Sequence, residues 1–208
     1  RHVVGRTGGD VAGAGVLDDS LVLFARDEVD GRLTQVAHIA QGSTLNSLPV
    51  SGLAGARAVA ASPDGQFLYV VSRTSDALSV FKLSNNGSGQ LRVDLVQTET
   101  GRVGLDQALQ VALSPEAGAA HVYVVGANDD AIAVFSRDVV TGLVTWIESE
   151  QNGINDASDS GGQVAGLDGV EYLVLSPDGR QAYALSGAGG SVAAFDRNTS
   201  NGRLSWRG

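Results

Sequence analysis

The feature that most constrains the fold of this chain is an internal repeat. Three Gly-Leu pairs each stand 10 residues before the serine of a Ser-Pro pair: Gly52 before Ser62, Gly104 before Ser114 and Gly166 before Ser176. Each Ser-Pro pair is followed by a run that contains a tyrosine and then by one that contains a phenylalanine (Tyr69 and Phe81, Tyr123 and Phe135, Tyr183 and Phe195). Because these landmarks recur in one order, the chain is predicted to consist of copies of one supersecondary unit.

Residues 52–97 show the unit as four short strands. Ala58–Ala61 is an apolar run that ends at Ser62-Pro63-Asp64-Gly65, a sequence typical of a tight turn. Three further runs of β-branched, aromatic or alternating residues follow: Phe67–Val71, Ala77–Leu83 and Leu91–Val96. Polar or glycine-rich segments separate these runs, so the unit is predicted to be a four-stranded antiparallel meander.

One such meander cannot bury both of its faces, and it leaves two open edges. Copies of about this length bury their faces when they stack radially as the blades of a propeller. The predicted fold class is therefore all-β, a β-propeller of four-stranded antiparallel blades in a single segment. The predicted blades are residues 1–51, 52–103, 104–165 and 166–208.

The first of these blades is predicted to be incomplete. Arg1–Gly5 aligns with Tyr69–Ser72, the second strand of its unit, and a glycine-rich loop is expected from Arg6 to Asp19. Leu21–Arg26 and Leu33–Ile39 then supply a third and a fourth strand. With three strands here and four in each other blade, the chain is predicted to be an arc of a larger propeller. Other polypeptide, from missing sequence or a second chain, is expected to cover the ends and to add a strand beside Val3 and Val4.

The residues that carry the repeat also resemble those of a known family. Gly-Leu-Asp-Gly at 166–169, Ser-Pro-Asp-Gly at 62–65, Val-Tyr-Val-Val at 122–125 and Ala-Val-Phe-Ser-Arg-Asp at 133–138 are similar to the lactonase-like, YVTN-type β-propeller repeats of bacteria. The resemblance covers nearly the whole chain and implies a propeller fold. It implies no single activity, because the family includes enzymes, binding modules and surface proteins.

Composition excludes several classes of function. The net charge of −9 argues against nucleic acid, since phosphate binding requires clustered lysine and arginine. No apolar stretch approaches 18 residues, so no membrane span is expected. Cysteine is absent, which excludes thiol chemistry. The expected location is extracellular, on the cell surface or periplasmic.

Long connections are predicted to gather at one end of the blades. The links after second and fourth strands fall at that end and include Gln41–Gly55, Thr98–Gln107 and Glu150–Gly169. Such loops are often binding elements, although tolerated insertion is the alternative. Because this end is acidic, a cation or a basic protein partner would be attracted to it. The candidate ligand-binding residues in these loops are Asp106, Asp129, Asp130 and Asp168.

A cofactor is not required by any motif, and Ca²⁺ is the one metal to which the sequence points. Asn155, Asp156 and Asp159 offer the oxygen ligands that Ca²⁺ uses, but without the spacing of a helix–loop–helix calcium site. An ordinary turn cluster of Asn, Asp and Gly is the alternative. The three histidines do not cluster, because His2 and His121 are expected on second strands and His38 on a fourth.

Arg57, Leu109 and Glu171 occupy equivalent places, five residues after the glycine of their Gly-Leu pair, at the start of the innermost strand. Side chains at that place approach the central channel of a propeller, so Arg57 and Glu171 are candidate ligand-binding residues. Leu109 breaks the polar pattern, and no catalytic set can be matched. The sequence therefore favours a non-catalytic binding or structural module of a secreted or surface protein. The alternatives are a lactonase-type hydrolase whose site needs further blades, and a Ca²⁺- or carbohydrate-binding surface module.

Overall fold

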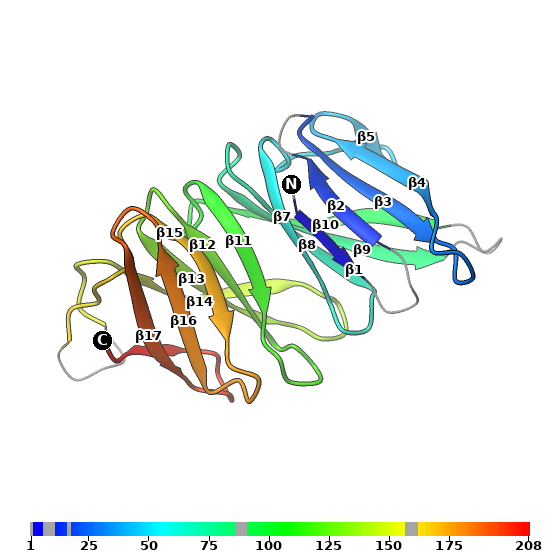
Figure 1. The fold of residues 1–208 in the computed structure, drawn as a ribbon. Helices are drawn as coiled ribbons and strands as arrows, with labels where there is room; N and C mark the ends of the chain where they lie inside the picture. Colours follow the sequence, from blue (N-terminus) through cyan, green and yellow to red (C-terminus); the bar gives the residue numbers. More distant parts are fainter. Residues whose placement is uncertain (1, 6–10, 16–17, 86–90, 157–161) are drawn as a thin grey trace. The chain divides into compact units, whose positions relative to one another are not determined.

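The computed structural model describes residues 2–5, 11–15, 18–85, 91–156 and 162–208 (Figure 1). In this part of the chain the strands form four four-stranded antiparallel sheets and one two-stranded sheet, as the predicted fold class requires. We name the larger sheets I (β1–β4), II (β7–β10), III (β11–β14) and IV (β15–β18). The described residues contain no helix long and apolar enough to cross a membrane.

The strands have the following bounds: β1 His2–Gly5, β2 Val11–Gly15, β3 Ser20–Arg26, β4 Leu33–Ala40, β5 Thr44–Leu45, β6 Leu48–Pro49, β7 Ala56–Ala61, β8 Phe67–Ser72, β9 Ala77–Asn85, β10 Leu91–Thr100, β11 Ala108–Leu113, β12 His121–Gly126, β13 Ala131–Arg137, β14 Val144–Gln151, β15 Val170–Leu175, β16 Gln181–Ser186, β17 Ser191–Arg197 and β18 Leu204–Trp206.

The chain divides into two compact units, a first unit of Arg1–Thr100 and a second unit of Gly101–Gly208. Sheets I and II lie in the first unit, and sheets III and IV lie in the second. Each sheet falls inside one of the four ranges predicted as blades. The assignment of the whole chain to a single domain stays a prediction.

Sheet I corrects the prediction of an incomplete first blade. Its order is β1-β2-β3-β4, so β1 is a first strand and β2 is the second strand. β2 lies in the segment that was expected to be a loop, because glycine and alanine are poor indicators of a strand. Its sequence forms a strand because it pairs on both sides, for example Val4 with Ala12 and Gly13 with Val22.

The same topology overturns a further expectation. His2 lies on a first strand, not on a second. β1 is an end strand of its sheet with one hydrogen-bonded neighbour, as β7, β11 and β15 are of theirs. The strand of other polypeptide expected beside Val3 and Val4 stays a prediction.

The Ser-Pro turns form as the sequence predicts. In sheet II the hydroxyl of Ser62 accepts a hydrogen bond from the Phe67 backbone N–H at 3.0 Å, and Gly65 takes a φ of 68°. Ser176 accepts from the Gln181 N–H at 2.9 Å in the same way, and Gly179 has the same φ of 68°. These two turns join first strands to second strands at equivalent places.

The connection between sheets I and II is not an irregular loop. It contains the hairpin β5–β6, whose two turn residues, Asn46 and Ser47, have φ values of 50° and 69°. Two consecutive positive φ values are typical of a type I′ turn, and asparagine tolerates that conformation well.

The apolar core of each unit lies between its two sheets. In the first unit Leu21 and Leu23 of sheet I pack with Phe81 of sheet II, and in the second unit Tyr123 of sheet III packs with Phe195 of sheet IV. The four phenylalanines of the repeat all lie on third strands, as predicted: Phe24 on β3, Phe81 on β9, Phe135 on β13 and Phe195 on β17. Phe24 is half-buried and the other three are fully buried.

Candidate functional site

A β-bulge lies at each of three equivalent positions: Arg57, Leu109 and Glu171. In sheets II, III and IV the register of the first strand slips by one residue, between Ala56 and Ala58, between Ala108 and Gln110, and between Val170 and Tyr172. The extra residue of each β-bulge is the one singled out by the sequence. Bulges often re-aim a side chain at a functional site. The predicted equivalence of these three positions is thus structural.

Glu171 is the exposed carboxylate of this set in the second unit. It lies beside Gly187, where an added Cβ atom would come within 2.5 Å of the Glu171 Oε1. Any larger residue at 187 would therefore displace the carboxylate. Arg57, in the first unit, is half-buried at its bulge. The roles of both in ligand binding stay predictions.

Asp129 and Asp130 have structural partners. The Oδ2 of Asp129 accepts hydrogen bonds from the backbone N–H groups of Gly104 at 2.6 Å and Asp106 at 3.0 Å. The Oδ1 of Asp130 accepts from the Gly169 N–H of sheet IV at 2.7 Å. Both aspartates therefore hold the segments that enter first strands, and Gly169 stands two residues before Glu171.

The first unit contains a hydrogen bond equivalent to the one between Asp130 and Gly169. Asp19 of sheet I accepts a hydrogen bond from the Gly55 N–H at 2.7 Å, two residues before Arg57. Asp19 and Asp130 have nearly the same left-handed backbone conformation, with φ values of 49° and 50°. Aspartate is one of the few residues that tolerate this conformation. In each unit, the aspartate just before the third strand of one sheet thus binds the segment that leads into the β-bulge of the next sheet.

Replacing Asp130 tests this link. Asp130→Gly keeps the backbone conformation but removes the acceptor for the Gly169 N–H, so the free energy of unfolding should fall by about 1–3 kcal/mol. Asp130→Asn keeps an oxygen acceptor and should lose less. Urea denaturation measures the loss, and amide exchange at Gly169 should accelerate in the glycine variant alone. Equal stability of the two variants would show that the hydrogen bond contributes nothing.

Asp106 and Asp168 are exposed in the second unit. Asp106 accepts a hydrogen bond from the side chain of Asn128 at 3.1 Å, and the backbone carbonyl of Asp168 accepts one from the Gly189 N–H at 3.3 Å. With Glu171, they are the predicted carboxylates that face solvent. Their contact with a ligand stays a prediction.

The predicted calcium ligands are only partly described. Asp156 is 4% exposed, and its Oδ2 accepts a hydrogen bond from the Trp206 backbone N–H at 2.9 Å. Asn155 is exposed and pairs with Gln163 in an isolated bridge, whereas Asp159 lies outside the described residues. Among the described residues no three acidic, histidine or cysteine side chains are grouped so as to hold a metal. The Ca²⁺ site stays a prediction.

Two carboxylates near Asp156 were not predicted as site residues, and one of them is buried and the other partly buried. Glu150 on β14 is 4% exposed, and burial, followed by the charges of Asp156 and Glu148, raises its pKa to about 8. Glu148 accepts a hydrogen bond from the Leu204 N–H at 2.8 Å and pairs with Arg203. Alternation along β14 could have indicated an inward face, but the register shift after Val134 disguises it.

A second polar cluster joins sheets III and IV. The buried Arg197 donates hydrogen bonds to Glu116 at 2.6 Å, to the Tyr123 hydroxyl at 2.5 Å and to the His121 Nδ1 at 2.8 Å. Burial is the largest influence on Glu116 and opposes its ionisation, but the hydrogen bonds from Arg197, the backbone and Ser114, together with the charge of Arg197, outweigh it and lower the pKa to about 2. The His121 Nδ1 also lies 3.3 Å from the Glu116 Oε1, and burial lowers the pKa of His121. This cluster is a hydrogen-bond network between sheets III and IV.

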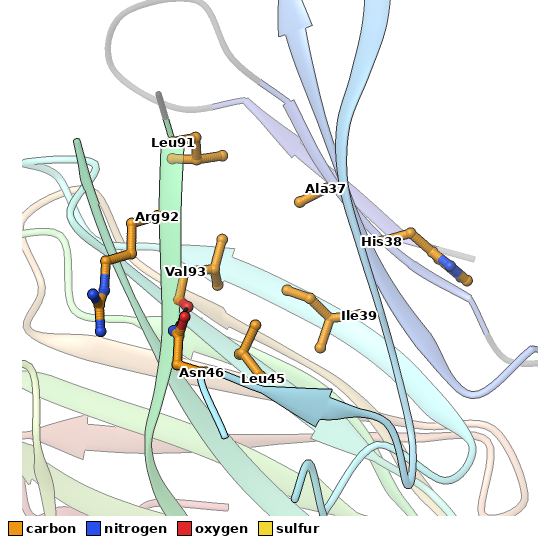
Figure 2. Close-up of a pocket in the computed structure, with 8 residues that line it drawn as sticks. All are labelled: Ala37, His38, Ile39, Leu45, Asn46, Leu91, Arg92 and Val93. Atoms are coloured by element: carbon orange, nitrogen blue, oxygen red, sulfur yellow. Dashed lines mark hydrogen bonds between the residues drawn. The ribbon is translucent and has the colours of Figure 1, made fainter. Parts of the chain in front are cut away.

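The first unit also contains a cavity of about 400 Å³ (Figure 2). It lies between β4, the β5–β6 hairpin and β10 and is lined by Ala37, His38, Ile39, Leu45, Asn46, Leu91, Arg92 and Val93. Figure 2 shows the polar ends of His38 and Arg92 turned away from the apolar side chains. The Arg92 guanidinium instead pairs with Asp94, at 2.8 Å. The lining of the cavity therefore combines apolar side chains with the polar Asn46, His38 and Arg92.

Comparison with known proteins identifies the repeat. Residues 14–158 match the family model described as lactonase, 7-bladed β-propeller. An uncharacterised protein of Lactococcus lactis, YwcC, is 26% identical over 148 residues, which are 70% of this chain and 40% of that relative. The chain thus spans less than half the length of this curated relative.

Solved structures show the same fold. A candidate 6-phosphogluconolactonase of Bacteroides uniformis has a TM-score of 0.74 at 16% identity, over 99% of this chain and 52% of that one. The periplasmic gluconolactonase of Pseudomonas aeruginosa has a TM-score of 0.70 at 19% identity, over 99% of this chain and 55% of that one.

Proposed function

The chain belongs to the lactonase family of seven-bladed β-propellers, and from this premise we propose that it is part of a lactonase-type hydrolase that opens neutral sugar lactones. A lactonase-type hydrolase is the alternative that the sequence left open beside a binding module. Its site would be completed by further blades. Two structural neighbours that carry lactonase names support it over the non-catalytic binding module. The chain spans about half of each of these neighbours, so the activity belongs to the longer polypeptide.

The observation that carries the proposal is the repeated bulge. It places Glu171 as an exposed carboxylate at the first-strand position of sheet IV, against a glycine that leaves room for it. In lactone hydrolysis, water attacks the carbonyl carbon, the bond to the ring oxygen breaks, and that oxygen takes a proton to become a hydroxyl. We assign Glu171 the role of the base that accepts the proton of the attacking water. Glu171 lies beyond the residues matched by the family model, and Arg57 lies within them.

Charge supports a neutral substrate. Asp106, Asp168 and Glu171 are exposed in the second unit, and the whole chain carries a net charge of −9. A lactone that carries a phosphate group would be repelled by this field, whereas an uncharged aldonolactone would not. A periplasmic or extracellular location is part of the proposal, supported by the periplasmic neighbour.

The natural full-length polypeptide should hydrolyse glucono-δ-lactone above the rate in buffer, as measured by acid release at constant pH. Glu171→Gln should lower kcat by a factor of about 10²–10⁴, the usual contribution of a positioned base. Asp196→Asn, the same chemical change at a surface position with no assigned role, should leave kcat unchanged.

A phosphorylated lactone tests whether the negative charge of the chain disfavours a charged substrate. 6-Phosphogluconolactone should be hydrolysed with a higher KM than the neutral lactone, and the difference should shrink at high salt because salt screens the repulsion. Absence of turnover with both lactones, or full activity of Glu171→Gln, would contradict the proposal.

A further inference from the structure

Two arginines of sheet II leave the backbone at neighbouring places. Arg57 is the extra residue of the β-bulge in β7, and it directly follows Ala56, which pairs with Ser72 of β8. Arg73 directly follows Ser72, and its backbone N–H donates to the Gly55 carbonyl at 3.0 Å. The two arginines therefore lie diagonally across one strand pair, at the end of the sheet where β8 stops.

Sheet IV shows that side chains at these two positions come within contact distance. Glu171 and Gly187 are the equivalent residues there, because Glu171 follows Val170, Gly187 follows Ser186, and Val170 pairs with Ser186. A Cβ atom at position 187 would lie 2.5 Å from the Glu171 Oε1 and 2.9 Å from its Cδ. The side chain of the bulge residue thus reaches the residue that follows the second strand. With the same backbone arrangement in sheet II, Arg57 can reach the side chain of Arg73.

The fold does not require arginine at either position. Sheet III has Leu109 and Ala127 there, and the Ala127 N–H donates to the Gln107 carbonyl at 3.3 Å, as the Arg73 N–H does to Gly55. The same backbone contact therefore forms without a charged side chain. Because sheets III and IV form with other residue pairs, the two arginines of sheet II serve a purpose other than folding.

No carboxylate neutralises this pair within the part of the chain that the structure describes. None of its ion pairs includes Arg57 or Arg73. Asp19, whose Oδ1 binds the Gly55 N–H at 2.7 Å, and Asp76, three residues after Arg73, form no ion pair with them. Arg73 is exposed and Arg57 is half-buried, so solvent reaches both. Two adjacent cations repel each other, and an anion bound between them removes that cost.

We propose that Arg57 and Arg73 bind the carboxylate of a small organic acid. A guanidinium offers parallel N–H groups that match the two oxygens of a carboxylate. The net charge of −9 disfavours a doubly charged phosphate more strongly than a singly charged carboxylate. Hydrolysis of a neutral aldonolactone releases such a carboxylate, so under the proposed function the ligand is the reaction product. The binding itself does not depend on that function.

Gluconate is the probe that tests this site. Calorimetric titration of the natural full-length polypeptide with sodium gluconate should show binding that weakens as salt is added. Arg57→Gln and Arg73→Gln should each raise the Kd by tenfold or more, because each removes a charge-assisted donor. Arg73→Lys keeps the charge without the planar fork and should lose less. Arg32→Gln, at an exposed arginine of the same unit that pairs with Asp30, should leave the Kd unchanged.

Two further ligands define the chemistry of the site. Sorbitol, which has the hydroxyl groups without the carboxylate, should not bind. An unchanged Kd in Arg57→Gln or Arg73→Gln, or equal binding of sorbitol, would overturn the proposal. Tighter binding of inorganic phosphate than of gluconate would overturn the assignment to a carboxylate.

Lactone turnover, measured on the same preparation, separates this proposal from the proposed function. Gluconate binding that depends on both arginines, without lactone turnover, would contradict the proposed function alone. Lactone turnover without gluconate binding would contradict the carboxylate site alone. Circular dichroism checks that each variant keeps the fold, which both exposed and half-buried positions should allow.

Discussion

Replacing Phe81 with alanine is expected to lower the free energy of unfolding by about 3–5 kcal/mol, the usual loss for a buried phenylalanine. Phe81 is fully buried on β9, where it packs with Leu21 and Leu23 of sheet I. Truncation removes the ring from the centre of the contact between two sheets, and close-packed neighbours cannot fill the space. Urea denaturation monitored by circular dichroism measures the effect.

The chain provides a matched control for this substitution. Phe24 occupies the same place on β3, but it is half-buried. Phe24→Ala should therefore cost clearly less than Phe81→Ala, because less apolar area returns to water. Equal losses at the two positions would contradict the assignment of Phe81 to a core between sheets.

Replacing Glu150 with glutamine should stabilise the protein at alkaline pH. Burial beside Asp156 and Glu148 raises the pKa of Glu150 from its ordinary value of 4.5 to about 8. Between these values the folded state binds a proton that the unfolded state has lost, so the contribution of this carboxyl to stability is fully present below pH 4.5. It falls as the pH rises and is lost by about pH 8.

Glutamine is neutral at every pH, so Glu150→Gln removes this loss. At pH 9 the variant should exceed the parent in free energy of unfolding by roughly 2–5 kcal/mol, at about 1.4 kcal/mol per pKa unit. At pH 4 the two should be nearly equal. Urea denaturation across this pH range measures the difference, and Glu28→Gln, on an exposed side chain, should change stability by less than about 0.5 kcal/mol. A difference that does not depend on pH would refute the assignment.

The candidate site was predictable in its position and not in its geometry. The offset from the Gly-Leu pair brings Arg57, Leu109 and Glu171 to one place because the repeat fixes the register of each unit. The β-bulge at each of these residues was not predictable, because a one-residue slip depends on the partner strand. The acidic loops predict a binding surface, yet Asp129 and Asp130 accept hydrogen bonds from backbone N–H groups. Sequence does not reveal which carboxylates are already engaged.

The sequence by itself determined the repeat, the strands and the tight turns of sheets II to IV. These strands and turns depend on local preferences, such as a Ser-Pro-Asp-Gly turn or an alternating apolar run. Residues that are neighbours in the sequence determine such preferences.

Only the tertiary structure decided the remainder. The strand Val11–Gly15 exists because β1 and β3 bind it from both sides, and glycine and alanine carry no local signal for that pairing. The pKa of Glu150 and the network around Arg197 depend on residues that are distant in sequence and close in space. Burial and electrostatics are properties of the assembled sheets, because they arise only when one sheet excludes water from the face of the next.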